Sequence, residues 1–352
     1  MIDEQVLLPV PNPARITFSV VNLPIKRDLN CGPFVLSPVA DIDKIVKRLK
    51  RPNAQSEITA GGTYLPPNPL PDDLWPTLGD EIRVLERLLT FAHRCRVHVV
   101  RPKLEEWSDG QWVSRGGPVY FFDHGHPSPR PWYAGQDELE GFLARNFKRF
   151  QDAEFTESTG IVLALAFYDQ IFSDYVTELQ YLKTWFCLEV LLSRHASASG
   201  LLRPPAFKNV RHRLEQALKV AVDDHLLKEE DRAAIKEKMG ELNRLSAVRQ
   251  GFSFLAKAFE KYPDQDVTED ELRAFVKVRN DIVHRGEMQS TTHELVRSLH
   301  GLPEGDLNAR DYAHDLGREQ RRLQSLFERV VLAMLGEHPQ LMGVSWREYQ
   351  LS

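Results

Sequence analysis

Three residues whose side chains can do chemistry together lie near the end of one predicted helix: Arg279, Asn280 and His284. An imidazole has an ordinary pKa of ~6.5, so His284 can transfer protons near neutral pH. The guanidinium of Arg279 stays charged at any accessible pH, and its planar fork suits the oxygens of an anion. The amide of Asn280 can orient either group. These residue types are suited to proton transfer beside a bound anion.

The segment that carries these residues has clear start and stop signals. Thr268 and Glu271 have the spacing of a capping box, and Gly286 tolerates the positive φ of a helix C-terminus. The sequence therefore predicts a helix over 269–285. At ~100° per residue, its apolar stripe consists of Leu272, Phe275, Val276, Ile282 and Val283. Arg279 falls in the middle of this stripe, where an unpaired charge would cost several kcal/mol.

A second predicted helix carries the opposite charge on its apolar face, at Glu189. The apolar residues around it are Leu182, Trp185, Phe186 and Leu192. A buried carboxylate is as costly as a buried guanidinium unless it is paired. We therefore expect this carboxylate to face Arg279, Asn280 or His284.

Arg279 and His284 do not share one face of a regular helix, because side chains five positions apart lie roughly 140° from each other. Two arrangements would bring them together. The last turn of the helix is loosened, which Gly286 allows, or two copies of the helix meet across a dimer axis and pool their side chains.

The segment 279–284, Arg-Asn-Asp-Ile-Val-His, resembles the motif of the HEPN domain family, and of its Apea-like branch in particular. Nuclease members of that family carry an arginine, then a polar residue, then a histidine, with four to six residues between arginine and histidine. Here four residues intervene. The pair Leu188-Glu189 on an aromatic-rich helix also resembles the Apea-like branch. The resemblance covers about residues 158–340, whereas the first 150 residues resemble no family.

The resemblance implies a homodimer whose two motifs form one site for metal-independent RNA cleavage. Arg279, Asn280 and His284 would be catalytic. In that role His284 moves protons at the ribose 2′-hydroxyl and at the leaving oxygen, and Arg279 stabilises charge on the phosphate. Glu189 and Asp281 would support them, and Arg285 would be a further phosphate ligand. Cleavage of this kind requires a 2′-hydroxyl, so DNA would be spared, and no cofactor and no metal are expected.

In bacteria, domains of this family are frequently toxic or antiviral. By analogy, the N-terminal region would be a sensor or regulator, and a regulatory partner protein would accompany the RNA substrate. The alternative is a non-catalytic HEPN module that dimerises, binds nucleotide or RNA, or scaffolds a partner. In that case Arg279 is a structural ion-pair member and His284 caps its helix.

The distribution of proline divides the chain, since 17 of the 22 prolines lie between Pro9 and Pro131. The sequence predicts an α+β N-terminal domain over 1–150, followed by an all-α, HEPN-like antiparallel helical bundle over 151–352. In the first part we expect strands at 15–20 and 97–100, a hairpin of 111–114 with 119–122, and a helix over 80–94. In the second part the predicted helices span 137–150, 160–175, 177–195, 207–222, 229–260, 268–285 and 309–336.

Two further clusters of polar residues have side chains that can take part in chemistry. Asp123, His124 and His126, with the nearby His93 and His98, resemble a small metal cluster. Turn formation explains the aspartate and the glycine of this segment more simply, and two histidines separated by one residue are a weak ligand set. On the last long helix, a basic turn consists of Arg318, Arg321 and Arg322. Because Glu319 and Glu328 are close in sequence, this turn is predicted to be a solvated face.

Composition limits the remaining function classes. The net charge of −5 argues against a surface that is broadly coated with lysine and arginine for phosphate binding. The three scattered cysteines, Cys31, Cys95 and Cys187, favour a reducing cytoplasm. The N-terminus carries no secretory signal, and the most apolar stretch, 161–172, is too short to span a bilayer, so no membrane partner is expected.

Overall fold

The computed structural model describes residues 14–51, 54–67, 70–118, 130–133, 135–198, 205–223, 228, 230–232, 235, 247–265, 267–302 and 309–339. The chain forms two compact units. The first contains the described residues up to Thr156 and the segment Leu165–Val176, and the second contains Glu157–Ala164 and Thr177–Pro339. Residues 165–176 therefore group with the N-terminal unit, whereas the sequence predicts them in the helical part.

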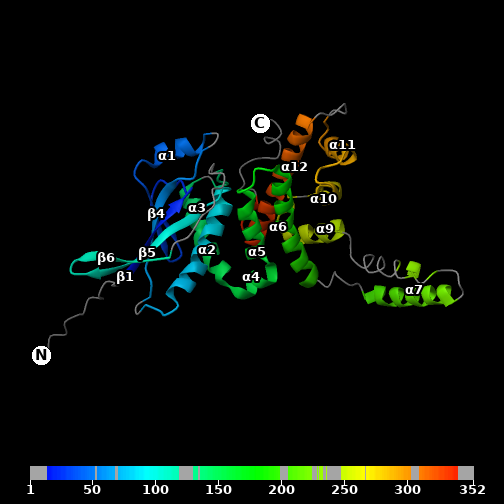
Figure 1. Ribbon diagram of the computed structural model, residues 1–352, viewed down its shortest axis with the longest axis horizontal. Helices are drawn as coiled ribbons and strands as arrows, with labels where there is room; N and C mark the ends of the chain where they lie inside the picture. Colours follow the sequence, from blue (N-terminus) through cyan, green and yellow to red (C-terminus); the bar gives the residue numbers. More distant parts are fainter. Residues whose placement is uncertain are drawn as a thin grey trace. The chain divides into compact units, whose positions relative to one another are not determined.

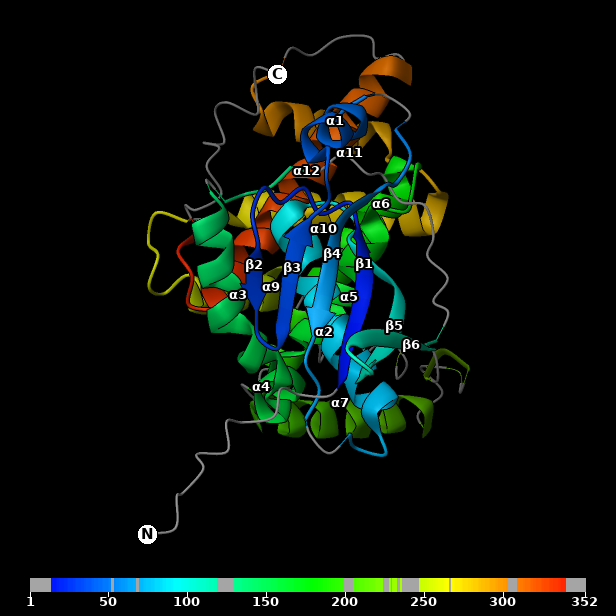
Figure 2. The same ribbon diagram turned by 90° about the vertical axis from the view of Figure 1, so that its left-hand side faces the viewer.

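The first unit is built on an antiparallel sheet (Figure 1). Its six strands are β1 (Ala14–Val21), β2 (Leu29–Cys31), β3 (Phe34–Pro38), β4 (Ile58–Tyr64), β5 (His98–Ser108) and β6 (Gln111–Gly116), in the order β2-β3-β4-β1-β5-β6. Its helices are α1 (Ile42–Leu49), α2 (Leu74–His93), α3 (Gln136–Gln151) and most of α4 (Ala153–Thr159). Figure 2 shows the strands in front of α2 and α3. Strand β1 covers the predicted strand 15–20, and its residues alternate between buried and half-buried up to Val20.

The predicted hairpin of 111–114 with 119–122 stays a prediction, because residues 119–122 lie outside the described residues. Strand β6 pairs antiparallel with the preceding strand, β5, so that Ser108 lies opposite Gln111. The connecting residues Asp109 and Gly110 have φ angles of 51° and 78°. Positive φ at both central positions is typical of a type I′ turn, for which Asp-Gly is a preferred sequence.

His93 at the end of α2 is completely buried, and the Tyr133 hydroxyl lies 2.8 Å from its Nε2. Burial lowers the pKa of His93 from 6.5 to about 3. The imidazole is therefore neutral in the folded chain at pH 7, and the hydroxyl can donate to it. Burial and the hydrogen bond with Tyr133 therefore explain His93 as a core residue.

The depressed pKa of His93 predicts a loss of stability in mild acid. The unfolded chain binds a proton near pH 6.5 whereas the folded chain does not until about pH 3, so stability is lost as the pH falls through this window. We expect the free energy of unfolding to fall by about 2 kcal/mol more between pH 7 and pH 5 in the wild type than in His93→Gln. Urea unfolding at both pH values measures this difference, and parallel pH dependences would contradict it.

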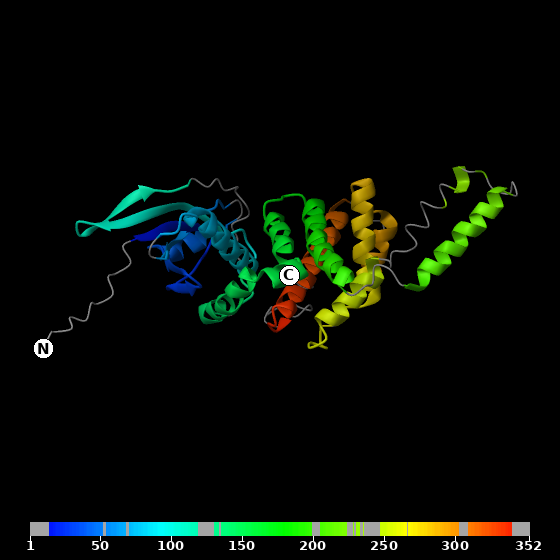
Figure 3. The same cartoon turned by 90° about the horizontal axis from the view of Figure 1, so that it is seen from below.

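The second unit contains helices α6, α7, α9, α10, α11 and α12 and the first residues of α5 (Ile161–Ile171). The helices span Thr177–Ala198 (α6), Pro205–Asp223 (α7), Ala247–Ala258 (α9), Glu269–Arg285 (α10), Ser290–Leu299 (α11) and Ala309–Met334 (α12). Helix α12, orange to red in Figure 3, packs along α6, in green. Trp185 and Phe327 are buried in the core of this unit. Helix α11 and the short helix α4 were not predicted.

A row of charged side chains joins α11 to α12 inside the second unit. We call these residues the polar ladder: His293 and Arg297 on α11, His300 at its C-cap, Asp315, Glu319 and Arg322 on α12, and Glu271 on α10. On both α11 and α12 the spacing is i, i+4, i+7, which places the three side chains on one face of each helix. The polar ladder therefore runs along the contact between these two helices.

The acidic members on α12 are sealed from solvent, since the side chain of Glu319 is 0% exposed and that of Asp315 is 3% exposed. Asp315 Oδ2 lies 2.6 Å from His293 Nε2 and 2.9 Å from Arg297 Nη1. Burial alone would raise the pKa of Asp315, but the hydrogen bonds from His293 and Arg297 lower it below its ordinary value. Arg322 Nη1 lies 3.0 Å from Glu319 Oε1, and its Nη2 pairs with Glu271.

The prediction of a solvated basic face on α12 is therefore wrong for part of this turn. Arg321 is exposed, but the Arg322 side chain is only 13% exposed, and Glu319 and Glu328 are both buried. The ion pairs of Arg322 are formed with residues far away in sequence, on α10, and nearby, on α12 itself. Local charge balance did not reveal them.

Candidate functional site

Helix α10 carries the motif and begins and ends as predicted. Thr268 Oγ1 accepts the backbone N–H of Glu271 at 3.2 Å, and Glu271 Oε2 accepts the backbone N–H of Thr268 at 2.9 Å, which completes the capping box. Gly286 has a φ of 81° and donates its N–H to the Ile282 carbonyl at 2.9 Å. The helix is regular through Arg285, so the loosened last turn is not observed.

The buried side of α10 differs from the predicted apolar stripe. Its buried residues are Leu272, Ala274, Phe275, Val278 and Ile282. Val276 is half-buried and Val283 is 46% exposed, so these two members of the predicted stripe do not point into the core. Arg279 consequently lies at the edge of the buried side and keeps access to solvent, rather than in its middle.

The predicted pairing of Glu189 with the motif is confirmed. Glu189 Oε1 lies 3.7 Å from Arg279 Nη2, and the two side chains are 45% and 27% exposed. Nearby, the buried Tyr181 hydroxyl on α6 donates to the Phe275 carbonyl at 3.0 Å, which ties α6 to α10. A partly exposed pair at this distance contributes about 0–1 kcal/mol, so it does little to fix the fold.

The guanidinium of Arg279 retains unused hydrogen-bonding capacity. Its Nη1 donates to Asn280 Oδ1 at 2.9 Å, which orients the guanidinium plane. Its Nε is buried and has no hydrogen-bond partner among the described residues, whereas its Nη2 is too far from Glu189 for a hydrogen bond and is the group left for an incoming anion. Arg279 can therefore donate to an anion without breaking its bond to Asn280.

His284 and Arg285 occupy the last turn of α10, and both side chains are exposed. Neither has a hydrogen-bond or ion-pair partner within the part of the chain that the structure describes. On a regular helix His284 lies about 7.5 Å along the axis from Arg279 and roughly 140° around it. One copy of α10 therefore does not bring the imidazole and the guanidinium to the same face.

Asp281 connects the motif to the following helix. Its Oδ2 accepts the backbone N–H of Gln289 at 3.1 Å and also the hydroxyl of Thr292, at the start of α11. The backbone N–H of Met288 donates to the Tyr312 hydroxyl at 2.7 Å. These bonds fix the turn that follows His284, so Asp281 supports the motif by holding the end of α10 in place.

The described residues do not bring the suspected metal ligands together. Asp123, His124 and His126 lie outside the described residues, and His93 is accounted for by Tyr133. His98 Nδ1 lies 3.7 Å from Glu86 Oε1. Within the described ranges, no group of three or more His, Cys, Asp or Glu side chains is arranged to hold a metal ion.

Comparison of the chain with protein-family models, with curated proteins and with solved structures gives no match. The likeness to HEPN domains therefore rests on the residues of α10 and on Glu189 of α6. Among the helices that the structure describes, none is both long and apolar enough to cross a membrane.

Proposed function

We propose that this chain is a metal-independent endoribonuclease of HEPN type, in which Arg279, Asn280 and His284 act on the RNA phosphodiester. The observation that carries the proposal is that the side chains of His284 and Arg279 both keep hydrogen-bonding groups without a partner among the described residues. On the same capped helix lie an exposed imidazole without a partner among the described residues and a guanidinium whose Nη2 is too far from Glu189 for a hydrogen bond. Groups that serve only packing are normally paired or buried.

In the proposed reaction, His284 accepts the proton of a ribose 2′-hydroxyl, and the 2′-oxygen attacks the adjacent phosphorus. The bond from phosphorus to the 5′-oxygen breaks, and the imidazolium of His284 returns its proton to that oxygen. The products are a 2′,3′-cyclic phosphate and a 5′-hydroxyl. Arg279 stabilises the negative charge on the phosphate oxygens, a task for its free N–H groups, and Asn280 holds the guanidinium plane. Arg285 is a further phosphate ligand.

The proposed active form is a homodimer. Arg279 and His284 of one copy diverge around α10, so a site that contains both groups on one side needs a second copy of the helix. Val283, exposed between them, supplies apolar surface for such a contact. By analogy with HEPN proteins, the activity serves toxin action or antiviral defence, and the N-terminal unit senses or regulates.

The alternative proposal, a non-catalytic HEPN module, is favoured by the structural contacts of the supporting residues. Glu189 pairs with Arg279, and Asp281 binds the start of α11. In this alternative the surface around Arg279 binds RNA or nucleotide or contacts a partner without cleaving anything.

Cleavage assays with total cellular RNA separate these proposals. We expect the purified chain to cut RNA into fragments with 2′,3′-cyclic phosphate ends, and to leave a DNA of the same length intact, because DNA lacks the attacking hydroxyl. EDTA is expected to leave the rate unchanged, since no step uses a metal. Binding of RNA without cleavage would favour the non-catalytic module, and loss of activity in EDTA would refute the metal-free mechanism.

A further inference from the structure

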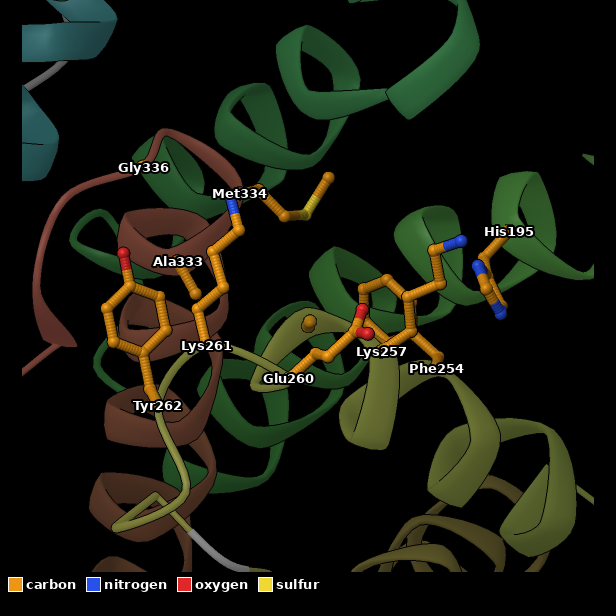
Figure 4. A pocket seen from close by; sticks show the side chains of 10 residues that line it. His195, Phe254, Lys257, Glu260, Lys261, Tyr262, Ala333, Met334 and Gly336 are labelled. Carbon is orange, nitrogen blue, oxygen red and sulfur yellow. The ribbon is translucent and has the colours of Figure 1, made fainter.

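A cavity in the helical unit lies away from the motif, where the end of α6, helix α9 with its following turn, and the end of α12 meet (Figure 4). It encloses about 400 Å³. Phe254 and Met334 line it with apolar surface, and Tyr262 adds an aromatic ring whose edge contacts His338. This volume and lining suit an organic molecule of modest size.

Basic groups stand at both ends of this cavity. Figure 4 shows Lys257 with His195 at one end and Lys261 with Tyr262 at the other. Burial, together with the positive charge of Lys257, lowers the pKa of His195, so its imidazole is neutral at pH 7 and Lys257 supplies the charge at this end. Glu260 is the acidic lining residue, so the lining carries an excess of positive charge.

The usual structural role of these lysines does not account for them. Lysine near a helix C-terminus commonly donates to the last carbonyl groups. Here the backbone satisfies those carbonyls, since Glu260 N–H donates to the Lys257 carbonyl at 3.3 Å and Gly336 N–H donates to the Ala333 carbonyl at 3.0 Å. Neither Lys257 nor Lys261 has a hydrogen-bond or ion-pair partner among the described residues.

We propose that this cavity binds a small organic anion with a flat apolar body, whose phosphate or carboxylate group is held by Lys257 or Lys261. The apolar body packs against Phe254, Tyr262 and Met334. Helix α9 also packs against α10, where Gly251 lies against Leu272, so a bound ligand rests on the neighbour of the motif-bearing helix. The proposal does not depend on the ribonuclease activity.

Titration calorimetry at pH 7.5, which measures the binding of phenyl phosphate to the full chain, tests the proposal. We expect phenyl phosphate to bind at least tenfold more tightly than phenol, which lacks the charge, and than inorganic phosphate, which lacks the ring. The double variant Lys257→Gln/Lys261→Gln is expected to bind phenyl phosphate at least tenfold more weakly than the wild type does. Both lysines are exposed, so these substitutions leave the core untouched.

A matched control removes the same amount of charge elsewhere in the helical unit, through Lys219→Gln/Lys228→Gln, two exposed lysines that do not line the cavity. We expect this variant to bind phenyl phosphate as the wild type does. Absence of saturable binding, equal binding of phenol or of inorganic phosphate, or equal weakening in both double variants would each overturn the assignment.

Discussion

The variant His284→Ala is expected to lose RNA cleavage by a factor of about 10²–10⁴ while it stays folded. The reason for the loss is that no other group in the motif transfers protons near neutral pH. The reason for the intact fold is that the side chain is exposed and unpaired among the described residues. The free energy of unfolding should change by no more than about 0.5 kcal/mol. Cleavage rates of purified proteins and urea unfolding measure the two quantities.

His314→Ala is the matched control, because His314 is also an exposed histidine of the helical unit, with a side chain that is 61% exposed. Its removal should leave cleavage within twofold of the wild type. If His284→Ala and His314→Ala both cut RNA as fast as the wild type, His284 has no catalytic role. If both lose activity equally, the effect is not specific to the motif.

The variant Arg322→Met is expected to destabilise the helical unit by about 3–5 kcal/mol. Methionine fills much of the same space, but the change removes the permanently charged partner of Glu319, whose side chain is 0% exposed, and leaves its carboxylate with the imidazole of His300 alone. Glu271 loses its partner as well. An uncompensated buried charge is among the most costly defects in a protein interior. The free energy of unfolding from urea titration at pH 7 measures the effect.

The neighbouring substitution Arg321→Met provides the control for this prediction. Arg321→Met removes the same charge from the adjacent position of the same helix, but the Arg321 side chain is exposed. It should change the free energy of unfolding by about 0.5 kcal/mol or less. Equal effects of the two variants would mean that the buried pairs of Arg322 add nothing to stability.

The sequence predicted those parts of the site that depend on local signals. The capping box at Thr268, the C-terminal Gly286 and the charge complementarity of Glu189 with Arg279 act over one helix or between two charged residues. The rotation of the buried side was predicted incorrectly. Periodicity gives the width of an apolar stripe but does not decide whether Val283 or Val278 lies nearer its centre, because the neighbouring helices decide that.

The features that the sequence did not reveal depend on contacts between distant segments. The polar ladder becomes visible only when α11 and α12 lie side by side, since its charges look like solvated surface in either helix alone. Lys257 and Lys261 likewise line a cavity only because the ends of α6 and α12 lie beside them. The hairpin of β5 and β6 was not predicted, although the Asp109-Gly110 turn is a local signal for it.

The regular last turn of α10 has a consequence for dosage. If neither copy holds the Arg279 guanidinium and the His284 imidazole on one side of α10, a single copy is inactive. The proposed RNA cleavage then begins only when two copies associate. The rate of transcript loss would then grow with the square of the amount of protein while association is weak. A cell that keeps this chain scarce would thereby keep it harmless without any inhibitor, and a modest rise in synthesis would switch it on steeply.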